Sequence, residues 1–114
     1  MFTKEEVEVL AYRRYASSET YDKSVWYFAE LVVKILKNVK NGGDIKPFEA
    51  DNLVLLLNDN VDGELIEPTK DEIKELAEVI YNEHPEKSKL HFFIAEKQLL
   101  LREIRKVIKD NRHN

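Results

Sequence analysis

Apolar residues recur every three or four positions along most of the chain, which is the periodicity of amphipathic α-helices. The first periodic segment follows "FTKEEV", where Thr3 and Glu6 have the spacing of a capping box, and it is expected to end near Tyr15. The second covers residues 19–39 and is apolar over most of its circumference. A helix of that kind usually lies at the centre of a bundle.

The second half of the chain predicts three further helices. One starts at Pro47, which is tolerated in a first helical turn. The next starts at a second capping box, Thr69 with Glu72, and ends before Pro85. The last extends from about residue 85 to 109, and at 1.5 Å per residue it spans roughly 37 Å. It is the longest helix expected in the chain.

These segments predict an all-α fold. We expect residues 1–114 to form a single helical domain, a compact bundle of four to five helices with helix 19–39 central and a long C-terminal helix. The composition agrees, since 43% hydrophobic and 35% charged residues are typical of a soluble globular protein. Three glycines and three prolines are too few for the many turns of an all-β fold.

The composition also limits which kinds of site the chain can form and where in the cell it is expected. The chain has no cysteine, which excludes disulfides, thiolate catalysis and cysteine metal sites. Its longest apolar run, residues 53–57, is far shorter than a membrane span, and the acidic N-terminus is unlike a secretory signal. We therefore expect a cytoplasmic protein with no membrane contact. The Lys-, Asn- and Glu-rich composition suits an AT-rich bacterial or phage genome.

The C-terminal helix carries apolar residues on two sides. Its wide stripe packs on the bundle, and Phe92, Ala95 and Leu99 form a narrower second stripe at i, i+3 and i+7. Either this helix is sandwiched within its own domain, or the second stripe meets another chain. We favour the second alternative, a contact with a protein partner or within a homodimer. Lys97 lies in the wide stripe, where it either extends past a small neighbour or pairs with an acid from a facing helix.

Trp26 and Tyr27 point away from the main stripe of helix 19–39. Aromatic side chains in such positions are typical anchors of protein interfaces. They also serve in a second set of core contacts, and the sequence leaves both roles open. We include both residues among the candidate partner-binding residues.

Charge is unevenly distributed along the chain, whose net charge is -4. Residues 44–86 hold three Lys/Arg against thirteen Asp/Glu, whereas residues 87–114 hold eight against three. The basic residues of the last helix share one face, as nucleic-acid contact would require: Arg102, Arg105, Lys106 and Lys109. The same residues also suit the C-terminal end of a helix and pairing with the acidic segment.

The remaining motifs give little indication of metal binding or catalysis. "NDNVDGEL", residues 58–65, resembles part of an EF-hand calcium loop, but the position of the closing bidentate Glu is occupied by Thr69. An Asx-rich turn is the simpler interpretation. His84, His91 and His113 lack the spacing of metal ligands on a helix, and neither a nucleophile motif nor a phosphate-binding loop occurs. We expect no metal, no cofactor and no catalysis.

The sequence therefore favours a small non-enzymatic protein-interaction module. Such a regulator, adaptor or inhibitor would act through helix-surface contact with a macromolecular partner. The alternative is a nucleic-acid-binding regulator that uses the basic face of the C-terminal helix. The two differ in their salt dependence, because phosphate contacts weaken steeply as salt concentration rises.

Overall fold

The computed structural model describes residues 2–40, 57 and 64–112, and these residues form four helices. Their bounds are Lys4–Tyr15 (α1), Tyr21–Asn38 (α2), Lys70–Glu83 (α3) and Lys87–Arg112 (α4). The described residues contain no strand apart from an isolated antiparallel bridge between Val39 and Leu57. The all-α prediction is thus confirmed for this part of the chain. The helix expected from Pro47 and the turn at residues 58–63 lie outside the described residues.

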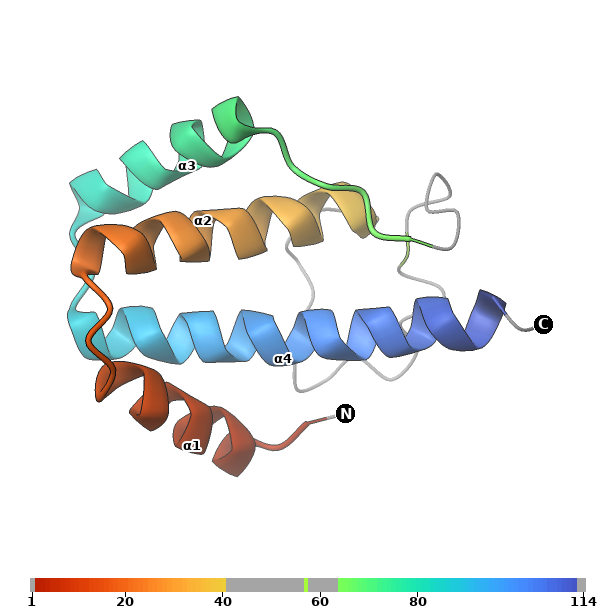
Figure 1. The fold of residues 1–114 in the computed structure, drawn as a ribbon, viewed down its shortest axis with the longest axis horizontal. Helices are drawn as coiled ribbons and strands as arrows, with labels where there is room; N and C mark the ends of the chain where they lie inside the picture. Colours follow the sequence, from red (N-terminus) through yellow and green to blue (C-terminus); the bar gives the residue numbers. More distant parts are fainter. Residues whose placement is uncertain (1, 41–56, 58–63, 113–114) are drawn as a thin grey trace.

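The four helices lie side by side in the spatial order α1, α4, α2, α3 (Figure 1). Helix α2 packs between α3 and α4, as its broad apolar surface predicted. Helix α4 is equally internal, because α1 packs along its other side. The C-terminal helix is the longest of those described, with 26 residues, as expected.

Both predicted capping boxes are present. The Thr3 hydroxyl accepts a hydrogen bond from the Glu6 backbone N–H, and the Glu6 carboxylate accepts one from the Thr3 N–H, each at 3.2 Å. Thr69 and Glu72 make the same two contacts at the start of α3, at 3.2 and 2.9 Å. Each box satisfies two backbone N–H groups that the first turn leaves unpaired, which fixes where its helix begins.

Helix α2 begins two residues later than expected because Thr20 is its N-cap, and the Thr20 hydroxyl accepts from the Lys23 N–H at 3.3 Å. Its C-terminal end is fixed by Asn38, a fully buried polar residue that periodicity did not single out. The Asn38 amide donates to the Ile66 carbonyl oxygen at 2.9 Å, and its oxygen accepts from the Ile66 N–H at 2.7 Å. These bonds tie the end of α2 to the segment that leads into α3.

The second apolar stripe of α4 faces α1 of the same chain. The side of α4 toward α1 is marked by a ring contact between Tyr15 and His91 and by an ion pair between Glu6 and Arg102. Ala95 and Leu99 lie on this side and are buried. The chain itself covers these two residues, which is the first of the two alternatives that the sequence left open.

Phe92, the third residue of that stripe, is half-buried and packs against the core, with its ring edge-on to Phe93 at 6.1 Å. Phe93 is partly exposed and stacks on Phe28. Lys97 is half-buried, and its ammonium lies 3.5 Å from Glu96 of the same helix instead of an acid on a facing helix.

None of the described helices combines the length and the apolar character needed to cross a bilayer.

The position of Leu99 predicts a stability effect. Leu99 is 7% exposed, so Leu99→Ala removes buried side-chain volume between α1 and α4 and should lower the unfolding free energy by about 2–4 kcal/mol. Leu36→Ala is the matched control, because Leu36 is 42% exposed and the same substitution there should cost less than about 1 kcal/mol. Urea denaturation measures both. Equal losses at the two positions would contradict the packing of α1 on α4.

Candidate partner-binding groove

A groove of about 520 Å³ lies between α2 and α3. Its floor contains the buried residues Val25 and Ala77, whose short side chains leave a hollow between larger neighbours. The remaining lining residues are Asp22 and Trp26 from α2, and Lys74, Glu78, Tyr81 and Asn82 from α3. Trp26 was a candidate partner-binding residue from its place on the helix, and the structure places it in this groove.

Two aromatic side chains of the groove remain open to solvent. Trp26 is 38% exposed and Tyr81 is 48% exposed. Tyr81 follows the apolar periodicity of α3, but α3 packs along α2 alone among the described helices, so its apolar stripe is not fully covered. Periodicity places Tyr81 on the face of α3 that is turned toward α2. It does not show that the Tyr81 ring stays exposed to solvent.

Neighbouring rings hold Tyr81 in place. The Tyr21 ring lies 6.2 Å from that of Tyr81, and the His84 ring lies 5.4 Å from Tyr21 and 6.5 Å from Tyr81. The Tyr21 hydroxyl donates to the Pro85 carbonyl oxygen at 2.6 Å. Burial raises the pKa of Tyr21, and the nearby Tyr81 and Asp22 raise it further. His84 itself ends α3 in the left-handed conformation, with φ of 52°.

The groove also carries unpaired charges. Asp22, Lys74 and Glu78 form no ion pair or hydrogen bond with other side chains of the described residues. Glu72, by contrast, forms an ion pair at the other end of α3. The Lys37 ammonium at 2.7 Å, together with Thr69, lowers the pKa of the Glu72 carboxyl to about 2. Helix α3 as a whole holds five Asp/Glu against two Lys, so the surface beside the groove is acidic.

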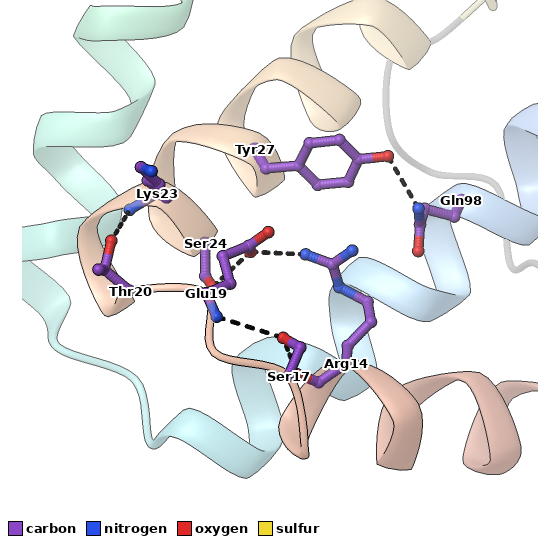
Figure 2. Close-up of polar contacts among 8 residues, drawn as sticks. All are labelled: Arg14, Ser17, Glu19, Thr20, Lys23, Ser24, Tyr27 and Gln98. Carbon is purple, nitrogen blue, oxygen red and sulfur yellow. Dashed lines mark hydrogen bonds and ion pairs between the residues drawn. The ribbon is translucent and has the colours of Figure 1, made fainter.

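Tyr27, the other aromatic candidate on α2, does not line this groove. Its hydroxyl accepts a hydrogen bond from the Gln98 amide at 2.8 Å, and the Arg14 guanidinium lies 4.9 Å from the centre of its ring (Figure 2). Tyr27 is half-buried and packs against the core. Tyr27 thus contributes to core contacts, one of the two roles that the sequence left open, since it joins α1, α2 and α4.

A polar cluster surrounds that contact at the connection between α1 and α2 (Figure 2). The Glu19 carboxylate accepts from Arg14 and from the Ser24 hydroxyl, each at 2.7 Å. Ser17 donates to the Arg14 carbonyl oxygen at 2.6 Å and accepts from the Glu19 N–H at 3.4 Å. These bonds hold the end of α1 against the start of α2.

His91 is the most deeply buried titratable group of this region, with 1% of its surface exposed. Neither ring nitrogen has a hydrogen-bond partner among the described residues, and the ring lies edge-on to Tyr15 at 6.2 Å. Burial lowers the pKa of His91 below its ordinary value of 6.5. The charges of Arg14 and Lys87 lower it further, while Glu19 opposes them.

The basic face of α4 is partly neutralised within the chain. Arg102 lies 3.7 Å from Glu6 and 3.3 Å from Glu103, and Lys106 lies 3.7 Å from Glu103. Arg105 and Lys109 are exposed and form no ion pair with the other described residues. Nucleic-acid binding by this face stays a prediction. Among the described residues, no group of three or more His, Asp or Glu side chains is placed to hold a metal ion.

Comparison of the chain with protein-family models, with curated proteins and with solved structures finds no match in any of the three.

The environment of His91 predicts a pH dependence of stability. Because the folded pKa lies below the unfolded one, the unfolded chain binds more protons between the two values, and stability falls as the pH decreases below about 6.5. The loss amounts to about 1.4 kcal/mol for each unit of pKa difference. His91→Phe should remove this part of the pH dependence and raise the unfolding free energy near pH 5.5.

Denaturation at several pH values from 8 to 5 measures the effect. His84→Asn is the matched control, since residue 84 is exposed and asparagine tolerates its left-handed backbone. This variant should retain the wild-type slope. A wild-type unfolding free energy that does not change from pH 7 to pH 5 would contradict the assignment.

Proposed function

We propose that this protein is a small non-enzymatic interaction module, a regulator, adaptor or inhibitor, and that it binds a segment of a partner protein in the groove between α2 and α3. The observation that carries the proposal is the pair of exposed aromatic rings, Trp26 and Tyr81, on the two sides of one hollow. Trp and Tyr are the side chains most enriched among residues that dominate protein interfaces.

The dimensions of the groove favour an extended ligand over a small ion. Its α3 lining runs from Lys74 to Asn82, which is about 12 Å along a helix at 1.5 Å per residue. Two antiparallel helices with a hollow between them present the kind of surface on which a partner helix lays its apolar side. Full burial of one large apolar side chain in such a hollow contributes roughly 1.5–3 kcal/mol before the costs of association.

The alternative on the basic face of α4 has less support. Arg102 and Lys106 already lie beside carboxylates of the same chain. A phosphate backbone would have to compete with those carboxylates, and the net charge of -4 opposes approach of a polyanion. For these reasons the groove, and not the basic face, is the site we propose.

A peptide selection tests the proposal. Random peptides displayed on phage are selected on the wild-type chain and depleted on a Trp26→Ala/Tyr81→Ala variant. We expect enriched peptides to bind the wild type at least about 30-fold more tightly than the variant, because loss of an interface anchor typically costs 2 kcal/mol or more. Fluorescence anisotropy with the synthetic peptides gives the affinities.

The matched control is Tyr12→Ala. Tyr12 is the most exposed aromatic residue described, at 73%, and it lies on α1, away from the groove. Its loss should leave peptide affinity unchanged, and circular dichroism verifies that each variant is folded. The proposal fails if the enriched peptides bind the groove variant as tightly as they bind the wild type.

A further inference from the structure

We infer that the groove between α2 and α3 recognises a cationic side chain, arginine or lysine, on the partner segment, and holds it against Trp26 and Tyr81 beside the carboxylates of Asp22 and Glu78. This inference rests on the proposed function, since it names the chemistry of the segment that the groove would bind.

The two aromatic rings of the groove attract cations. The faces of Trp and Tyr rings carry negative electrostatic potential, and a guanidinium or ammonium over such a face is favoured, most strongly over Trp. The same chain already uses this interaction twice. The Arg14 guanidinium lies 4.9 Å from the Tyr27 ring centre, and the Lys87 ammonium lies 5.0 Å from that of Tyr15. The rings of Trp26 and Tyr81 have no such cation among the described residues.

The groove also carries two carboxylates that no cation of the described residues neutralises. Asp22 and Glu78 both line the groove, and neither forms an ion pair with a described residue. Glu78 is four residues after Lys74 on α3, yet no ion pair joins the two side chains. Asp22 and Glu78 are exposed, whereas the half-buried Glu19 and Glu72 each pair with a cation of the chain, Arg14 and Lys37. Two carboxylates left open beside two rings therefore favour a cation supplied from outside.

The charged residues of the groove are arranged along its length. Helices α2 and α3 are antiparallel (Figure 1), and the contact between Tyr21 and Tyr81 places the end of α3 beside the start of α2. Asp22 and Glu78 therefore lie toward the Tyr81 end of the groove, and Lys74 lies one helical turn beyond Glu78. The partner's cationic side chain belongs at the Tyr81 end, and an apolar or acidic residue of the segment belongs near Lys74.

A pair of small probes tests the inference directly. Trp26 is the only tryptophan of the chain, so its indole N–H gives one assignable signal that reports on the groove. N-acetyl-arginine amide is titrated against the ¹⁵N-labelled protein, and N-acetyl-citrulline amide, which has nearly the same shape without the charge, is titrated in parallel. We expect arginine to shift the Trp26 indole signal with an affinity about tenfold higher than that of citrulline, which corresponds to about 1.4 kcal/mol.

Matched variants separate local from overall charge. Asp22→Asn with Glu78→Gln should reduce the arginine affinity to that of citrulline. Asp71→Asn with Glu75→Gln changes the net charge by the same amount on exposed residues that do not line the groove, and should leave the preference for arginine unchanged. Equal affinities for arginine and citrulline, or an arginine shift that survives the first variant, would overturn the inference.

The two proposals can fail separately. Groove-dependent peptides that contain no arginine or lysine would overturn the cation inference and leave the docking function intact. A specific arginine shift at Trp26, together with no groove-dependent peptide from the selection, would support the cation site and overturn the docking of a protein segment.

Discussion

Helix α4 is packed on two sides, by α2 and by α1, and the other helices take their places from that arrangement. Its buried residues extend around most of the helix, and five of the largest are almost fully enclosed: Leu90, Ile94, Leu100, Leu101 and Ile104. Burial of each such side chain contributes roughly 1.5–3 kcal/mol. The two-sided apolar pattern that looked like an external interface is thus a requirement of the bundle, because α1 needs an apolar surface of its own to pack against.

The junction of α1, α2 and α4 is held by polar contacts at a cost in stability. Arg14, His91 and Gln98 each leave a buried nitrogen or oxygen atom without a partner among the described residues. An unsatisfied buried polar atom typically costs about 1–3 kcal/mol, so this cluster opposes part of what the apolar core contributes. In return, Glu19 joins the end of α1 to the start of α2 through Arg14 and Ser24. The junction thus connects α1 to α2 at the point where both helices lie beside α4.

Local signals in the sequence predicted where helices begin. They predicted poorly which residues a neighbouring helix covers. Thr3 and Thr69 located two helix starts because a capping box involves residues only three apart. Leu36 belongs to the helix predicted to be apolar over most of its circumference, yet it is exposed. Asn38 is buried through bonds to Ile66, 28 residues away. Periodicity finds the apolar side of a helix, but which part of that side a neighbour covers depends on the packing of the whole chain. For this reason Trp26 could be identified as a candidate from sequence, whereas Tyr81, Asp22 and Glu78 could not.

The groove is positioned by contacts at both ends of α3. At one end the Tyr21 hydroxyl bonds to the Pro85 carbonyl oxygen, and at the other Asn38 bonds to Ile66 and Lys37 to Glu72. Between these points α2 and α3 approach through the short side chains of Val25 and Ala77, which leaves the hollow unfilled. A ligand that enters would therefore meet a Tyr81 ring already held by Tyr21 and His84, so ordering of that ring would take little from its affinity. The same contacts that complete the outer layer of the bundle thus make its exposed aromatic rings suitable for recognition.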